Sequence, residues 1–266
     1  MGDVHSGCFE KKCQLLVLRD LSEQRKTEQL KQEFISTVSH ELRTPLTSIS
    51  GALGLATGGA LGELNSSQLR MLQLAQTNCQ QLTTLVNTLL DVEKLASGNM
   101  QFQLSVQPLL PLLQQCIDDC QILAQPQQIT LTLACPAELQ QVQVQADASR
   151  LKQVLLHLLG NAVKFSPPNS AVQVSLQLQQ RQLRVLIADE GAGISEQFVP
   201  KLFSRFSQAD SSDSRIHGGS GLGLAVSKSI IGHMHGSIGY MPNTPQGSCF
   251  YIELPFDASI QPGQLP

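Results

Sequence analysis

The sequence predicts an α + α/β protein, in which a helical hairpin is followed by an α/β sandwich. Its length of 266 residues is more than one compact domain usually needs and suggests about two units. Up to about residue 96, apolar residues recur at steps of three and four, which is the helical period. After Met100, short β-like runs alternate with helical patterns. The change of period at Met100 therefore divides the chain into two units.

Composition and charge exclude several classes of protein. The formal net charge of −3 leaves no electrostatic footprint for a nucleic-acid binder or an anionic membrane surface. The seven cysteines are odd in number and scattered, so we interpret them as reduced and mostly buried. Cys116 and Cys120 share a helix face but lack a second ligand pair for a metal. No long apolar run or signal-peptide pattern occurs, and we expect a cytoplasmic protein without membrane insertion.

The first unit, assigned to residues 23–99, is predicted to be a hairpin of two amphipathic helices. The first helix runs from Glu23 to about Ala56, and a Gly-rich segment at 57–62 breaks it. Asn65 or Ser66 can cap the second helix, which ends at Ser97-Gly98-Asn99. Because one hairpin cannot bury both apolar seams, we expect a homodimer held together by a four-helix bundle.

The second unit, assigned to residues 100–258, is predicted to be the α/β sandwich, with a tail at 259–266. Helices are expected at 109–124, 148–164 and 222–235. Strands are expected at 102–106, 129–134, 142–145, 172–178, 183–188, 237–240 and 248–254.

The first helix carries the string Ser39-His40-Glu41-Leu42-Arg43-Thr44-Pro45-Leu46. At 100° per residue His40 lies about 200° from Val38 and Leu42 of the apolar stripe, so we expect its imidazole to face solvent. A neutral imidazole is a nucleophile near neutral pH, and the adjacent Glu41 can accept its proton. Pro45 removes one helical hydrogen bond and loosens this turn. Alone, this pattern also fits an ordinary surface histidine.

Three further strings stand in the second unit. The helix at 148–164 contains Leu158-Leu159-Gly160-Asn161-Ala162-Val163-Lys164-Phe165, in which Asn161 and Lys164 share a face. Asp189-Glu190-Gly191-Ala192-Gly193-Ile194 follows a predicted strand, and His217-Gly218-Gly219-Ser220-Gly221-Leu222-Gly223-Leu224 precedes a predicted helix. Bare amides at such a helix N-terminus form a nest for phosphate.

Together these strings resemble, in order, the H-box and the ATP site of sensor histidine kinases, whose ATP-binding domain has the GHKL or Bergerat fold. The resemblance implies that His40 is the phosphoacceptor, with Glu41 beside it, and that Thr44 helps to dephosphorylate the partner. It implies ATP and Mg²⁺ as cofactors, with Asn161 as the metal ligand, Lys164 on phosphate and Asp189 on the adenine amino group. Gly191, Gly193, Phe203, Gly219, Ser220, Gly221, Leu222 and Gly223 are the other nucleotide-binding residues that it implies.

The implied function is that of a two-component kinase, which phosphorylates itself at His40 and passes the phosphoryl group to an Asp on a response regulator receiver domain. Residues 1–22 resemble the last strand of a PAS sensor domain. The hairpin with its H-box argues against a chaperone-type or mismatch-repair-type ATPase and against a Ser/Thr kinase. A catalytically weak scaffold that binds a regulator stays open, because His157 stands where the family usually has Asn and Cys249 replaces a hydroxyl residue.

Overall fold

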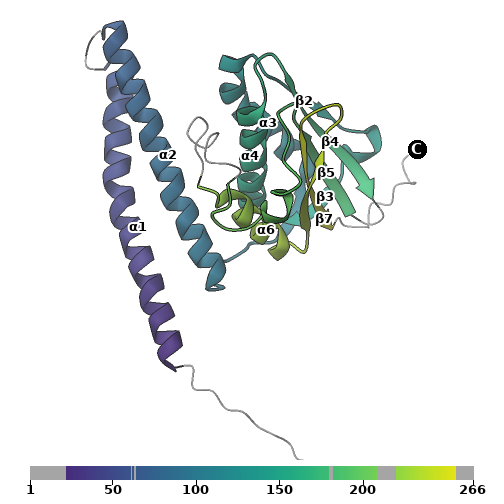
Figure 1. The fold of residues 1–266 in the computed structure, drawn as a ribbon, viewed down its shortest axis with the longest axis horizontal. Coiled ribbons are helices and arrows are strands. Elements are labelled where there is room, and N and C mark those ends of the chain that lie inside the picture. Colours follow the sequence, from purple (N-terminus) through teal and green to yellow (C-terminus); the bar gives the residue numbers. More distant parts are fainter. Residues whose placement is uncertain (1–21, 61, 63, 180–181, 209–219, 256–266) are drawn as a thin grey trace, which may run out of the picture.

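The computed structural model describes residues 22–60, 62, 64–179, 182–208 and 220–255. The predicted strand remnant at 1–22, apart from Ser22, and the predicted tail at 259–266 therefore lie outside the described residues. A long helical hairpin stands beside an α/β domain (Figure 1). Among the helices described, none is both long and apolar enough to cross a bilayer. The predicted fold class is confirmed.

The hairpin consists of α1 (Ser22–Thr57) and α2 (Ser66–Ala96). Asn65 caps α2, since its Oδ1 accepts hydrogen bonds from the backbone nitrogens of Ser67 and Gln68 at 3.1 and 2.9 Å. The Gln68 side chain accepts in return from the Asn65 backbone nitrogen at 3.0 Å. This reciprocal pair satisfies amides that a helix leaves open in its first turn, so it fixes the start of α2.

The seam between α1 and α2 is narrow. Its buried side chains are Leu46, Cys79 and Val86, and Leu53 packs against them. Other residues of the predicted stripes remain at least 36% exposed in the single chain: Val38, Leu42, Ile49, Leu82 and Leu89. Two helices bury only the side chains that face each other, so one hairpin retains a second apolar surface.

The α/β domain is built on a five-stranded sheet with the order β2-β4-β5-β7-β6. These strands are β2 (Thr130–Ala134), β4 (Ala171–Gln179), β5 (Gln182–Ala188), β6 (Ser237–Pro242) and β7 (Ser248–Pro255). Only β2 and β4 pair in parallel within this sheet. A separate antiparallel pair is formed by β1 (Ser105–Pro108) and β3 (Gln143–Ala146).

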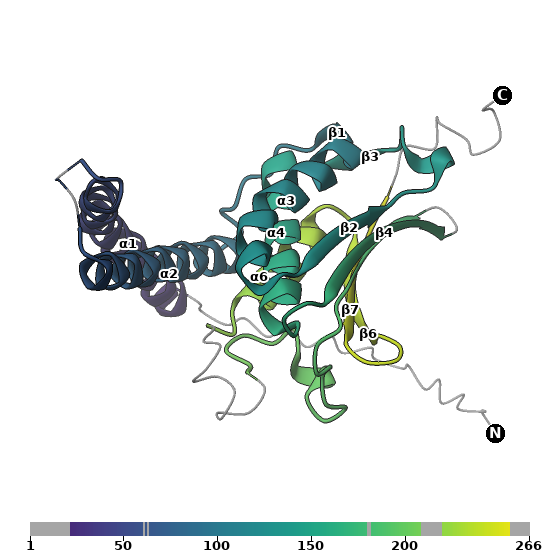
Figure 2. The ribbon, with the colours of Figure 1, turned by 90° about the horizontal axis from the view of Figure 1, so that it is seen from above.

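In the described part of the domain, three helices cover one face of the sheet, on the side of the hairpin (Figure 2). They are α3 (Leu109–Ala124), α4 (Ala148–Phe165) and α6 (Gly223–His233). Short 3₁₀ turns lie at η1 (Gln125–Gln127), η2 (Ala137–Leu139) and η3 (Val199–Lys201). Each helix predicted for this unit is present, and its ends lie within two residues of the expected ones.

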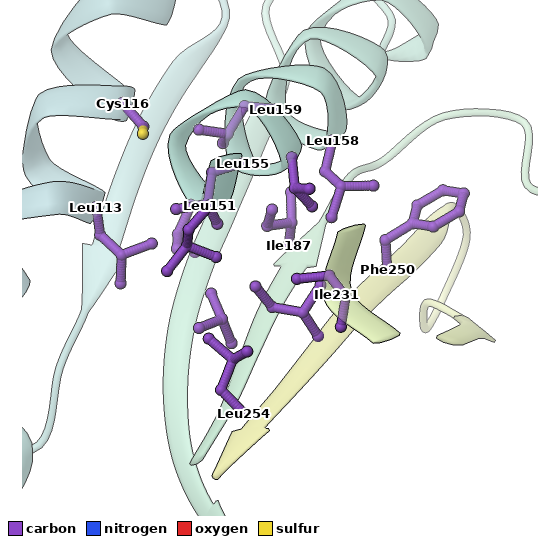
Figure 3. Packing of buried hydrophobic residues seen from close by; sticks show 14 of the residues in the cluster. Leu113, Cys116, Leu151, Leu155, Leu158, Leu159, Ile187, Ile231, Phe250 and Leu254 are labelled. Carbon is purple, nitrogen blue, oxygen red and sulfur yellow. The ribbon is translucent and has the colours of Figure 1, made fainter. Parts of the chain in front are cut away.

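The core lies between the helical layer and the sheet (Figure 3). From α4, Leu151, Leu155 and Leu158 are fully buried, and Ile187 of β5 and Leu254 of β7 meet this layer from the sheet. Alternate strand residues point into the core because side chains of a strand alternate between its two faces. Because the apolar stripe of α4 packs on the sheet, the polar residues of this helix lie on another side of it.

One predicted strand is displaced. We expected a strand at 102–106, but β1 covers Ser105–Pro108. The ring of Phe102 instead stacks on His233 of α6, with centroids 4.7 Å apart, and the Gln103 backbone nitrogen donates to Asp147 Oδ2 at 2.9 Å. Residues 102–103 thus make these contacts instead of pairing in a sheet. The partners lie far away in the sequence, so the local pattern of residues could not predict this.

The end of α2 packs against the α/β domain. Val92 and Met100 are buried in the core of that domain, and Leu95 packs against it. Figure 1 shows α1 on the far side of α2 from the α/β domain. The hairpin therefore touches the domain through α2.

Candidate active site

The predicted phosphoacceptor turn lies in the middle of α1. His40 belongs to this helix, but its side chain lies outside the described residues, so its exposure stays a prediction. Glu41 and Thr44 are exposed. Pro45 lies inside α1 and offers no backbone hydrogen to the carbonyl one turn before it, which is that of Glu41.

Two contacts tie this turn to α2. The Arg43 guanidinium donates to Asn87 Oδ1 at 2.9 Å, and the Cys79 thiol donates to the Leu46 carbonyl at 3.3 Å. The turn that carries Glu41 and Thr44 is thus held against the second helix from both its polar and its buried side.

A polar stripe runs along α4 beside its apolar face. His157, Asn161 and Lys164 follow each other at i, i+4 and i+7 and are all partly buried. The Lys164 ammonium lies 5.0 Å from the centre of the Phe165 ring, and burial lowers the pKa of Lys164. The predicted pair of Asn161 and Lys164 is therefore extended by a third residue, His157.

Asp189 is a buried carboxylate at the end of β5, with 3% of its surface exposed. Its Oδ1 accepts hydrogen bonds from the backbone nitrogens of Gly191 at 2.9 Å and Ser248 at 3.0 Å. Burial raises the pKa of Asp189, and these two bonds lower it in part. Within the described residues no hydrogen bond reaches Oδ2, which leaves one carboxylate oxygen for an incoming donor.

The loop after Asp189 is packed too closely for side chains. A Cβ on Gly191 would lie 2.5 Å from the Phe165 carbonyl oxygen, and one on Gly247 would lie 1.9 Å from the Asp189 carbonyl oxygen. Gly247 also has a φ of +121°, which side chains rarely permit. The Asp189 loop thus runs against both the end of α4 and the β6–β7 turn.

The Gly-rich string leads directly into α6. Gly219 lies outside the described residues. Gly221 has a φ of +64°, and a Cβ there would meet the Ser207 carbonyl oxygen at 2.7 Å. Ser220 Oγ accepts from the Leu222 backbone nitrogen at 3.3 Å, and Leu222 is buried. Among the described side chains none caps the N-terminus of α6, so within this part of the chain its first amides are open to an anion.

Phe203 and Phe206, which precede the Gly-rich string, have different surroundings. Phe203 is partly buried against the domain core, and the Lys228 ammonium lies 5.7 Å from its ring centre. Phe206 is 69% exposed. Phe203 therefore packs within its own domain, whereas Phe206 projects from it.

Two site features were missed in the sequence. Asn243 in the β6–β7 turn donates from Nδ2 to the Asp189 carbonyl oxygen at 2.8 Å, which ties this turn to the buried carboxylate. The second is the pairing of His157 with Ser227 of α6. Asn243 lies four residues before Gly247, and no local pattern in the sequence marked it as part of the site.

The polar groups left open here fit a magnesium nucleotide. Within the described residues no hydrogen bond reaches Asn161 Oδ1, and an amide oxygen is a hard ligand of the kind that Mg²⁺ accepts. Asp189 Oδ2 suits the amino group of a base, and the uncapped N-terminus of α6 suits phosphate. Gly191 against Phe165 and Gly223 against His157 bring the elements that carry these groups together.

Comparison with known families defines the class of protein. Residues 146–258 match the family described as histidine kinase-, DNA gyrase B-, and HSP90-like ATPase. Residues 30–98 match the family described as the His kinase A (phospho-acceptor) domain. Together these matches span most of the chain, and the chain belongs to the sensor histidine kinase family.

Individual relatives agree with this class. The chain is 33% identical over 232 residues to the circadian input-output histidine kinase CikA of Synechococcus elongatus, covering 87% of this chain and 31% of CikA. It is 35% identical over 229 residues to the sensor histidine kinase GacS of Pseudomonas protegens, covering 85% of this chain and 24% of GacS. The chain therefore spans less than a third of either relative.

The fold also matches a solved kinase. The crystal structure of full-length ShkA in complex with AMPPNP superposes with a TM-score of 0.67 at 30% sequence identity. The match covers 84% of this chain and 46% of that chain. Because this share is larger than the α/β domain alone, the likeness includes residues of both units.

Proposed function

We propose that this chain is the catalytic core of a two-component histidine kinase, which uses Mg·ATP to phosphorylate its own His40 and transfers the phosphoryl group to an Asp of a response regulator. One observation carries the proposal: Asn161, Asp189 and the uncapped N-terminus of α6 present open polar groups from packed elements of one domain. The same chain bears the His40 string on α1.

Each of these groups has a role in binding. Asp189 Oδ2 accepts a hydrogen bond from the adenine amino group, and the amides of α6 with Lys164 bind the phosphates. Asn161 Oδ1 holds Mg²⁺, which when bound neutralises phosphate charge. Two relatives carry kinase names and ShkA was crystallised with AMPPNP, which supports this assignment.

The chemistry requires little beyond positioning. One ring nitrogen of His40 forms a bond to the γ-phosphorus while the bond from that phosphorus to the bridging oxygen of ADP breaks. The proton on the other ring nitrogen passes to Glu41. The phosphoryl group then moves from His40 to a carboxylate oxygen of the regulator's Asp, and Thr44 orients water for its later removal.

The surface of the hairpin supports a homodimer. Val38, Leu42, Ile49, Leu82 and Leu89 leave apolar area exposed along both helices, and a second hairpin can cover it in a four-helix bundle. Light scattering should give the mass of two chains, and replacing Leu82 and Leu89 with Asp should give one.

Labelling with γ-³²P-ATP and Mg²⁺ tests the kinase activity. The wild type should take up acid-labile, alkali-stable label, His40→Gln should take up none, and the exposed control His235→Asn should match the wild type. Asn161→Ala should lose the label while remaining dimeric. The exposed control Asn99→Ala should keep the label. Addition of a receiver domain should remove label from His40. A wild type without label would overturn the kinase assignment and favour a regulator-binding scaffold.

A further inference from the structure

His157 contacts two different elements through its two ring nitrogens. Nε2 lies 3.3 Å from Nδ2 of Asn161, one turn further along α4, and Nδ1 lies 3.2 Å from Oγ of Ser227 on α6. An amide NH₂ group can only donate, so Nε2 must accept and therefore carries no hydrogen. Nδ1 then carries the ring hydrogen and donates to Ser227. These contacts define one neutral tautomer of His157.

The contact with His157 decides how the Asn161 amide is turned. Because Nδ2 donates to the imidazole, Oδ1 lies on the opposite edge of the planar amide and points away from the ring. Without this acceptor, a 180° rotation of the amide would cost little and would turn its NH₂ group toward a cation. His157 thus selects the orientation in which Asn161 can act as a metal ligand.

The ring of His157 also fills the space beside the first residue of α6. A Cβ on Gly223 would lie 2.1 Å from Nε2 and 2.5 Å from Cε1 of His157. Burial, together with the charge of Lys164, lowers the pKa of His157 to about 4, so the ring is neutral near pH 7. The imidazole therefore lies between Asn161 of α4 and the N-terminus of α6.

We propose that His157 is a positioning residue, which holds the Asn161 amide oxygen toward nucleotide-bound Mg²⁺ and, through Ser227, links that ligand to the phosphate-binding end of α6. The proposal rests on the function proposed above. His157, which stands where the family usually has Asn, would then contribute to metal binding. In this role His157 acts through its contacts with Asn161 and Ser227.

Calorimetric titration of the full chain with AMPPNP, in Mg²⁺ and in EDTA, tests the proposal. His157→Phe keeps a ring but removes both nitrogens, so Mg²⁺ should tighten AMPPNP binding about tenfold less than in the wild type. Affinity in EDTA should be unchanged. His157→Asn, which restores an acceptor, should retain the Mg²⁺ effect, and the exposed control His233→Phe should behave as the wild type.

Nitrogen-15 NMR of the histidine rings gives a readout that needs no nucleotide. His157 should show a protonated Nδ1 and an unprotonated Nε2, and Ser227→Ala should weaken this preference. The opposite tautomer in the wild type, or a His157→Phe variant with the full Mg²⁺ effect, would overturn the proposal. So would an equal loss of affinity in Mg²⁺ and in EDTA. If wild-type binding does not respond to Mg²⁺ at all, the proposed function fails instead.

Discussion

The side-chain amide nitrogen of Gln153 on α4 lies 2.6 Å from Oδ2 of Asp91 on α2. Arg150, one turn earlier on α4, places Nη1 3.4 Å from Asp91 Oδ1 and also donates to the Gln153 side chain at 3.0 Å. The Asp91 side chain is only 13% exposed. This three-residue contact joins the hairpin to the α/β domain by polar groups, beside the apolar contact made by Val92.

Removing Asp91 should loosen the α/β domain from the hairpin. Asp91→Ala deprives Arg150 and Gln153 of a shared acceptor, and a charge-assisted contact of this kind is worth about 1.5–3 kcal/mol, which raises the undocked population about tenfold or more. Chymotryptic cleavage after Phe102 should become faster by that factor. Asp118 on α3 is an exposed carboxylate that accepts a hydrogen bond from Gln114, so the control Asp118→Ala should leave the cleavage rate unchanged. Equal rates for Asp91→Ala and the wild type would contradict the prediction.

Gly223→Ala should be destabilising although alanine favours helices. The added Cβ would collide with the His157 ring at 2.1 Å, and overpacking of this kind costs about 1–3 kcal/mol. Apart from the nearby backbone of its own helix, no atom of the described residues lies within 4 Å of a Cβ added at Gly232 on the same helix, so Gly232→Ala should gain up to about 1 kcal/mol. Urea unfolding measures both. Because His157→Ala removes the ring, it should suppress the cost of Gly223→Ala in the double variant.

Asp189→Asn should weaken ATP binding without unfolding the chain. Asn can keep an oxygen on the Gly191 and Ser248 amides, but it then places an NH₂ group where the free carboxylate oxygen stood. Two donors would face each other at the adenine amino group, so the affinity for AMPPNP should fall about 10- to 100-fold. The control Glu190→Gln alters the exposed neighbouring carboxylate and should not change it. Calorimetry with GMPPNP should show no such loss, since guanine presents an acceptor there.

The contribution of Glu253 to stability should depend on pH. Its carboxylate on β7 accepts hydrogen bonds from Ser237 of β6 and Arg184 of β5, and these bonds lower the pKa of Glu253. A carboxylate whose pKa is lower in the folded chain adds stability above its ordinary pKa, and this stability is lost as the pH falls through the lowered value.

Glu253→Gln should therefore lower the free energy of unfolding by about 1–2 kcal/mol at pH 7. The difference from the wild type should shrink as the pH falls below 4.5, the ordinary pKa of this group, because the wild-type side chain becomes neutral as well. Thermal unfolding from pH 7 to pH 3 measures this. The exposed control Glu196→Gln should follow the wild type throughout, and a difference that grows toward low pH would contradict the prediction.

The sequence predicted the elements of this fold well because their signals are local. The periods of α1, α2 and α4 depend on neighbouring residues, and the Asn65 cap depends on one turn of chain. The domain boundaries and the roles of the site residues stay predictions. Asp189 and the glycines around it could be selected only because their strings resemble those of a known family.

Other features had no local signal. Asp91 and Gln153 are separated by 62 residues, and each looks in sequence like an ordinary solvated residue of a helix. Asn243 lies in a polar turn, where such residues are common for reasons of backbone geometry alone. Likewise, Phe102 suits a strand by its own propensity, and only the position of His233 reveals that it stacks instead.

The segment between α2 and β1, residues 97–104, is held in place by contacts along most of its length. Asn99 and Met100 both donate backbone hydrogen bonds to the Lys94 carbonyl, at 2.9 and 3.1 Å, and Met100 is buried, while Phe102 and Gln103 are each engaged by the α/β domain. In the proposed autophosphorylation, a nucleotide on this domain can reach His40 of its own chain only if the domain moves, because α1 lies beyond α2 (Figure 1), and the short segment 97–104 restricts that movement. Any such movement of the α/β domain has to break contacts of this segment. Its frequency therefore depends on a few residues around residue 100.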